Sequence, residues 1–326
     1  MSTSNLITQE VVTGGQTAGV LEGPSEGYWK QSWTRLRRDR FGMTFAVILA
    51  VLGALSLAAP AISALVTHYD PNSQDLTDIF GRASTAHWLG TDELGRDTLT
   101  RLVWGGRISL GVALLSVTLF ITIGTTVGMF AGYYRGIIDE ILMRAVDMLL
   151  AIPPIFLFIL VSSLLPIPIG LDPGHPWFII RHNPISLAVV IASVSWGWVA
   201  RLVRNEVLSL RDRDFVLAAH SLGASDWRLM FRHLLPNVLP VIIVAASLGV
   251  GQIVLVEAGL DFIGVGIQPP DASWGDMLTN AQREDFLYHS PLLVILPGAA
   301  ILLSVLSANM LGNAMRDAFD PRSANR

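Results

Sequence analysis

The chain has 326 residues, of which 52% are hydrophobic and 15% are charged, and its formal net charge is −4. In soluble domains about a quarter of the residues are charged, so this composition indicates a membrane protein. The net negative charge argues against a nucleic-acid partner. Since no cysteine is present, disulfides, thiolate metal sites and cysteine nucleophiles are excluded.

The N-terminal segment divides into two parts. Residues 1–27 are rich in Gly, Thr and Ser and contain few apolar residues, so a disordered cytoplasmic tail is predicted. Residues 28–41 interleave Trp29, Trp33 and Leu36 with arginines, a pattern typical of an amphipathic helix at the membrane interface. No basic residue precedes Lys30, which argues against a signal peptide.

Apolar runs long enough to cross the bilayer, which takes roughly 20 helical residues, then recur along the chain. They predict an all-α polytopic membrane protein with six transmembrane helices in one domain at 42–316 and a cytoplasmic tail at 317–326. Most of the 22 basic residues fall on one side of this arrangement, so both termini are predicted to be cytoplasmic. The six runs are 41–67, 108–134, 148–171, 183–200, 234–256 and 290–315.

Between the first two spans, residues 87–111 form a polar outer segment. Thr91 is predicted to cap a helix whose first turn holds Asp92 and Glu93. These carboxylates and Asp97 could instead bind a divalent ion, but Arg96 is the simpler charge partner. The seven histidines show no metal-ligand spacing, so a metal site is not expected.

In the third span, Arg144 and Asp147 are predicted to pair at the cytoplasmic border, and Pro153-Pro154 to kink the helix. The fifth span carries Glu257 and Asp261 four residues apart near its outer end. Two interpretations remain open: the pair lines a translocation path or an outer gate, or both carboxylates lie in headgroup water. The Gly- and Pro-rich loop that follows cannot continue the helix beyond about Gly264.

A polar hairpin at 212–236 separates the fourth and fifth spans. Asp214 is predicted to cap a short helix that ends near Gly223, and Ser225 to cap a second helix. The second helix carries one predicted apolar stripe on residues at helical spacing, namely Trp227, Met230, Phe231, Leu234 and Leu235.

Nucleotide hydrolysis by this chain is not expected. A phosphate-binding loop needs a lysine directly after glycine, and the single lysine, Lys30, follows Trp29. Work driven by ATP must therefore come from another polypeptide.

The hairpin resembles the cytoplasmic coupling loop of ABC-importer permeases. Ala218, Ala219, Gly223, Leu235 and Pro236 match its motif, whereas Leu217 replaces the usual Glu and His233 the usual Ile. The outer segment is similar to the signature of C-type permease subunits of peptide and nickel importers, on Gly90, Thr91, Asp92, Gly95, Arg96, Asp97, Arg101, Gly105, Arg107, Ser109 and Leu110. The loop after the fifth span looks like that of the same subunits, on residues that include Glu257, Phe262, Pro269, Pro270, Ser273, Trp274 and Gly275.

This resemblance implies a type I ABC-importer permease fold and a subunit that moves dipeptides or oligopeptides across the bacterial inner membrane by alternating access. It implies a heterodimer with a B-type permease, two ABC ATPase subunits that hold the ATP and Mg, and an extracytoplasmic solute-binding protein. The chain itself would be non-catalytic and hold no cofactor. Alternatives are the same machine for nickel complexes, glutathione-like peptides or oligosaccharides, or a secondary transporter or channel.

By this resemblance, the ATPase-coupling residues are Leu217, Ala218, Ala219, Gly223, Ala224, Ser225, Trp227, Met230, Phe231, Leu235 and Pro236. The proposed outer gate or path lining consists of Glu257, Asp261, Phe262 and Trp274.

Overall fold

The computed structural model describes residues 27–164, 183–280 and 290–320. Within these ranges the regular structure is helical, apart from one isolated bridge between Thr91 and Asp97. The predicted all-α class is therefore confirmed. The predicted N-terminal tail lies almost wholly outside the described residues, as do the last residues of the predicted C-terminal tail.

The helices follow in chain order, with gaps in the numbering. They are α1 (Tyr28–Arg38), α2 (Arg40–Leu57), α3 (Ala59–Ile62), α4 (Thr98–Tyr134), α5 (Gly136–Ala151), α6 (Pro154–Leu164), α8 (Pro184–Arg211), α9 (Asp214–Ser221), α10 (Asp226–Arg228), α11 (Leu235–Phe262), α12 (Trp274–Asn280) and α14 (Leu292–Phe319). Two π-helical segments, Ser63–Thr67 and Leu229–Leu234, extend α3 and connect α10 to α11.

Five described helical segments are long and apolar enough to cross a membrane, and α5 with α6 forms a sixth span if the bent pair is counted as one. The bend between α5 and α6 measures 96°. It follows from Pro153 and Pro154, because a proline lacks the amide that would continue the helix and holds the preceding residue, here Ile152, in an extended conformation. The predicted kink is confirmed.

Several helices are longer than the apolar runs that predict them. α4 begins at Thr98, ten residues before the predicted span, and α14 continues to Phe319. Polar residues continue these helices beyond the apolar runs, because a helix makes its backbone hydrogen bonds outside the bilayer as well as inside it. The helix then ends where a capping residue stops it. Apolar length therefore predicts the membrane-crossing part of each helix but not its ends.

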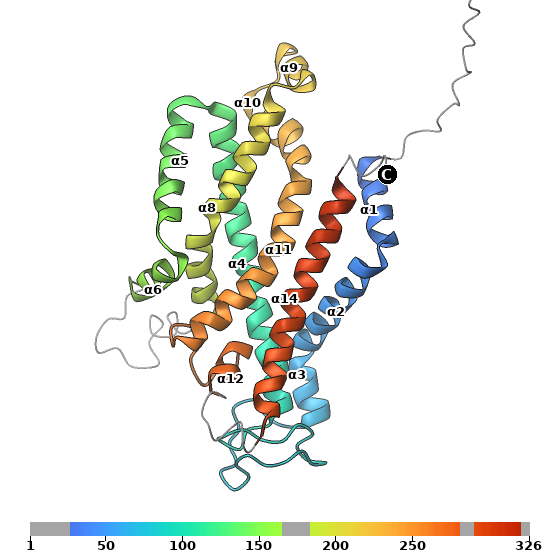
Figure 1. Cartoon of the computed structure of the whole chain (residues 1–326), viewed down its shortest axis with the longest axis vertical. Helices are drawn as coiled ribbons and strands as arrows, with labels where there is room; N and C mark the ends of the chain where they lie inside the picture. The colour runs from blue at the N-terminus through green and yellow to red at the C-terminus, as the bar shows by residue number, and fades with distance from the viewer. Residues whose placement is uncertain (1–26, 165–182, 281–289, 321–326) are drawn as a thin grey trace, which may run out of the picture.

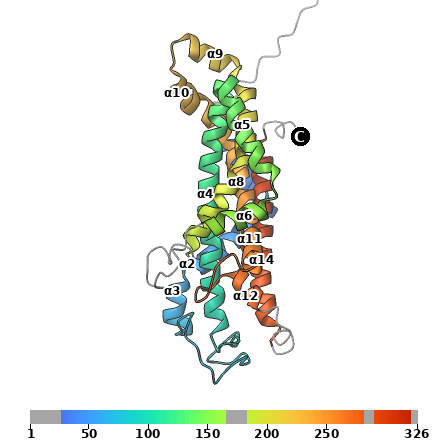
Figure 2. The same ribbon diagram turned by 90° about the vertical axis from the view of Figure 1, so that its left-hand side faces the viewer.

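Among the described helices, α4 and α8 make the most extensive contact, and they lie side by side in Figures 1 and 2. Gly124, Gly128 and Gly132 recur every fourth residue on α4 and face valines of α8. A Cβ atom added at Gly128 would lie 2.8 Å from the Val203 Cβ, closer than real Cβ atoms approach. Small residues at this spacing let helices in membranes approach closely, so these glycines set the distance between α4 and α8.

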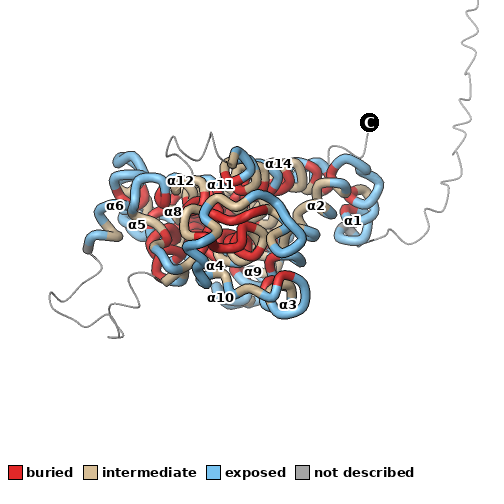
Figure 3. Tube along the Cα trace, turned by 90° about the horizontal axis from the view of Figure 1, so that it is seen from below, coloured by how far each residue is buried: buried red, intermediate tan, exposed pale blue. Residues whose placement is uncertain are grey.

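The bundle has two distinct ends (Figure 1). The α9–α10 hairpin, α1 and the C-terminal end of α14 lie toward one end, and residues 68–97 with α12 lie toward the other. In the view along the bundle, buried residues gather at its centre and the flanking helices are exposed (Figure 3). The exposed apolar side chains of α2, such as Val47, Val51 and Leu55, suit a lipid or protein environment rather than water.

Candidate functional site

The first arm of the hairpin, α9, does not begin as predicted. Arg213 occupies the N-cap position and Asp214 lies in the first turn, where its negative charge favours the helix N-terminus. The prediction that Asp214 caps this helix is wrong by one position. The end of α9 agrees with prediction, because Gly223 has a φ of +82° and its amide donates to the His220 carbonyl.

The second arm begins with Ser225, whose hydroxyl accepts from the Arg228 amide, so the predicted cap is confirmed. The predicted single apolar stripe is divided between the core and the surface. Met230 is 1% exposed and packs in the core, whereas Trp227 is 62% and Phe231 38% exposed. Met230 and Leu234 form the edge of the stripe that faces the core, whereas Trp227 and Phe231 form its exposed edge, and the segment Leu229–Leu234 is π-helical.

The hairpin carries exposed apolar side chains on both arms and at its turn, which we together call the docking face. They are Phe215, Leu217, Leu222, Trp227 and Phe231. The rings of Trp227 and Phe231 lie 4.1 Å apart and form its largest aromatic area. Exposed apolar clusters of this kind mark protein or membrane contacts. Of the other predicted coupling residues, Ala218, Gly223, Ser225 and Pro236 are exposed, and Ala219, Ala224 and Leu235 are half-buried.

A buried tyrosine anchors the hairpin to the bundle. The Tyr133 hydroxyl, at the end of α4, donates to the Asp226 carboxylate at 2.7 Å, and the Arg211 guanidinium lies 5.4 Å from the centre of the Tyr133 ring. Sequence analysis missed this contact, because its partners are 93 positions apart and neither stands out locally. It ties the docking face to α4.

At the opposite end, α4 begins at Thr98, with Asp97 as its N-cap and the Thr100 amide donating to the Asp97 carboxylate at 2.8 Å. The predicted Thr91 cap is wrong. Gly90 and Gly95 have φ values of +79° and +69°, which turn the chain and prevent a helix here.

Arg96 neutralises the acidic residues before α4. Its guanidinium contacts Asp92 at 2.7 Å and Glu93 at 2.8 Å, as the charge-partner interpretation predicts. Burial, and then the neighbouring Asp92 charge, raise the pKa of Glu93 above its usual range. No cluster of three potential metal ligands exists among the residues that the structure describes.

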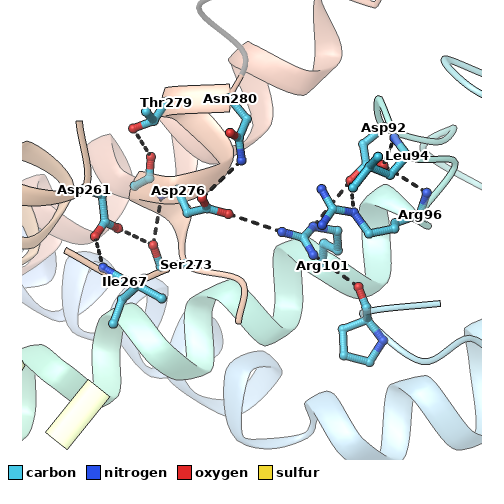
Figure 4. A network of polar contacts seen from close by, with 12 residues as sticks. Asp92, Leu94, Arg96, Arg101, Asp261, Ile267, Ser273, Asp276, Thr279 and Asn280 are labelled. Carbon is cyan, nitrogen blue, oxygen red and sulfur yellow. Dashed lines mark hydrogen bonds and ion pairs between the residues drawn. The ribbon is translucent and has the colours of Figure 1, made fainter. Parts of the chain in front are cut away.

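Arg101 is buried at the centre of this outer network (Figure 4). It lies 3.5 Å from Asp92 and 3.3 Å from Asp276 of α12, and it donates to the Pro71 carbonyl at 3.2 Å. The network therefore joins α4, α12 and the 68–97 segment through one side chain. Arg107, also in the predicted motif, lies outside it and stacks on Trp104, 5.1 Å from the ring centre.

The carboxylate pair of α11 is buried inside the chain. Glu257 is fully buried and accepts from the Ser109 hydroxyl at 3.1 Å, while Asp261 accepts from the Ile267 amide at 2.5 Å and from the Ser273 hydroxyl. The headgroup-water interpretation is therefore wrong for this conformation. The loop after α11 folds back over the helix end, and Asp261 holds it there (Figure 4).

Trp274 belongs to the same outer packing. It is 2% exposed, its indole donates to the Leu102 carbonyl at 2.9 Å, and its amide donates to the Ser109 hydroxyl. Of the four residues predicted to form an outer gate or path lining, only Phe262 is exposed.

Removing the α4 cap should lower stability. Because Asp97→Ala removes the acceptor for the Thr100 amide, we expect a loss of about 1–2 kcal/mol and a lower Tm of the detergent-purified protein. Asp70→Ala, which removes only an exposed turn contact from the Asn72 amide, is the control and should change stability by less, about 0.5 kcal/mol. Equal Tm values for the two variants would show that the cap contributes nothing.

The arrangement of the helices has a counterpart among solved structures. An inward-facing crystal structure of the MetNI methionine ABC transporter matches with a TM-score of 0.50 and 18% identity, covering 67% of this chain and 96% of that chain. The likeness establishes the fold of a type I ABC-importer permease.

Sequence comparison defines the family. Residues 124–325 match the family described as binding-protein-dependent transport system inner membrane component, and residues 27–83 match the N-terminal transmembrane domain of oligopeptide transport permease C. The chain belongs to this inner-membrane component family, and it is a permease subunit of an ABC importer.

Two relatives show the range of transport systems in which similar chains occur. The dipeptide transport system permease protein DppC of Alkalihalophilus pseudofirmus is 35% identical over 90% of this chain and 90% of its own length. The nickel transport system permease protein NikC of Escherichia coli is 35% identical over 84% of this chain and 92% of its own length.

Proposed function

We propose that this chain is the C-type permease subunit of an importer for peptides of the dipeptide or oligopeptide class. It pairs with a B-type permease, works with two ATPase subunits that bind ATP and Mg, and receives cargo from a solute-binding protein. The permease makes no bond itself. The observation that carries the proposal is the docking face, a set of exposed apolar side chains on a helical hairpin tied to α4.

The polarity of the bundle supports a bacterial cytoplasmic-membrane location with the hairpin and both termini inside. The hairpin lies toward the same end as α1 and the end of α14 (Figure 1). The α1 helix carries Arg35, Arg37 and Arg38 in its last turn, and positive charge of this kind is retained on the cytoplasmic side. The outer ion network lies toward the other end, where a delivering protein would arrive.

Peptide cargo is favoured by the match to the oligopeptide permease domain and by the dipeptide relative. The nickel relative is equally similar, so nickel complexes remain the second candidate. Uptake of a labelled dipeptide and of nickel by the reconstituted transporter separates the two.

Replacing Trp227 with Asp should abolish docking of the ATPase subunits, because a charge enters the centre of the docking face. Replacing Gly223 with Val should weaken docking by straining the positive-φ turn. We expect at least about a tenfold loss of ATPase subunits that copurify with Trp227→Asp, and a parallel loss of uptake in vesicles.

Trp88→Asp is the matched control, since Trp88 is as exposed as Trp227 but lies in the outer segment. All three variants should insert normally in the membrane. The proposal fails if Trp227→Asp and Gly223→Val retain normal ATPase binding and transport.

A further inference from the structure

The helix α5 has three faces. At 100° per residue, Glu140, Arg144 and Asp147 fall on one face. Asp139 and the fully buried Val146 lie on a second face, which packs against α8, and Ile141 and Met148 lie exposed on a third. A charged face thus separates the packed face from an apolar one.

Ion pairs link this charged face to α8. Asp147 pairs with Arg201 of α8, and their side chains remain 57% and 47% exposed. Glu140 and Arg144 pair at 3.5 Å, both with 71% of the side chain exposed. We call Glu140, Arg144, Asp147 and Arg201 the charged stripe. A second ion pair joins the same two helices, Asp139 with Arg204 at 2.5 Å. It is more buried than the charged stripe and therefore shows what an ion pair inside the α5–α8 contact looks like.

The charged stripe lies on α8, which is long and apolar enough to cross the membrane, and on α5, which forms a span with α6 if the bent pair is counted as one. Asp147 is roughly 16 Å along the α5 axis from Gly136, at 1.5 Å per residue. An arginine can extend its long side chain toward the interface, but an aspartate has no such reach. Exposed charges at this depth are costly against hydrocarbon, so this face of α5 and α8 needs water.

We infer that the charged stripe lines the water-filled translocation path on the cytoplasmic side and contacts the cargo. The inference rests on the proposed function. The four residues carry two positive and two negative charges, so the stripe offers partners for both ends of a solute such as a zwitterionic peptide. The apolar face with Ile141 and Met148 then faces lipid.

The absence of cysteine from the sequence permits a direct test with single cysteines. Glu140→Cys and Asp147→Cys probe the charged stripe, and Ile141→Cys and Met148→Cys are controls at the same depth on the apolar face. Each is placed in the full transporter, in vesicles whose cytoplasmic side is accessible, and reacted with a membrane-impermeant maleimide. We expect the cysteines of the charged stripe to react at least about tenfold faster than the control cysteines. Adding alanyl-alanine to the vesicle lumen together with ATP should slow the reaction of the stripe cysteines.

Two results would overturn the inference. If the stripe and control cysteines reacted with the maleimide at equal rates, this part of α5 would lie in headgroup water. If neither stripe cysteine reacted even without cargo, the other permease would cover the stripe. Because the labelling rates measured without ATP do not need ATPase docking, their outcome is separate from that of the Trp227→Asp experiment.

A charge exchange provides a second measurement if a cysteine variant folds poorly. Asp147→Arg alone should reduce uptake while ATPase subunits still copurify, and combining it with Arg201→Asp should restore part of the uptake. Absence of any loss in the single variant would contradict a role for the pair in the path.

Discussion

Replacing Gly128 with Leu is expected to separate α4 from α8 and to destabilise the whole subunit. A side chain at this position has no room, because the Val203 Cβ and the Ala200 carbonyl already lie against the glycine. Overpacking of a well-packed interface costs about 1–3 kcal/mol, and an added Leu at a helix crossing belongs at the upper end. The measurement is the Tm of the detergent-purified protein together with its yield in the membrane.

Gly111→Leu is the matched control on the same helix, since no atom lies within 4 Å of a Cβ added there. It should leave Tm and yield near those of the parent protein, because the new side chain points into open space. Leu has a higher helix propensity than Gly, so an equal loss of stability in both variants would mean that the added side chain itself, rather than the α4–α8 contact, explains the Gly128 result.

Arg101→Met should cost about 3–5 kcal/mol, because it leaves the buried carboxylates of Asp92 and Asp276 without the cation that joins them. The outer segment and α12 should then separate from α4, which limited proteolysis of residues 68–97 would detect. Arg107→Met is the control, as Arg107 is an exposed arginine of the same helix. Adding Asp276→Asn to Arg101→Met should recover part of the stability.

The Arg101→Met defect should depend on pH. Burial already raises the pKa of Asp276 above its usual 3.8, and Arg101 opposes that rise. Without Arg101 the pKa of Asp276 rises further. A carboxyl whose pKa is raised on folding supports the folded state below its ordinary pKa and loses that contribution as pH rises through the folded value. The stability of the variant should therefore be closer to that of the parent protein at pH 5 than at pH 8. A loss of stability that does not change with pH would point to lost packing instead.

The length of the apolar runs and the residues that bend or end helices made much of the fold predictable. The six runs, the Pro153-Pro154 bend, the Gly223 turn and the Ser225 cap each depend on chemistry within a few residues. The third span shows the limit of this approach. The described helix begins at Gly136, well before the predicted run at 148–171, because paired charges interrupt the apolar sequence that the prediction needed.

Contacts between distant segments were not predictable in the same way. Arg144 was expected to pair with Asp147, but Asp147 pairs with Arg201 of α8 and Arg144 with Glu140. Glu257 and Asp261 were found by their type and spacing, yet whether they meet water depends on the loop that folds over them. The apolar stripe of the second arm was likewise found by its spacing, yet which of its residues face the core depends on how the hairpin packs against the bundle.

The helical run from Asp226 to Phe262 spans 37 residues, roughly 55 Å at 1.5 Å per residue, without a break in the described structure. One end carries the docking residue Trp227, and the other ends beside Asp261, which holds the outer loop through Ile267 and Ser273. Rigid elements carry a displacement along their whole length. If the ATPase subunits dock on the hairpin as proposed, a displacement there would reach the opposite end of the bundle along one helical run.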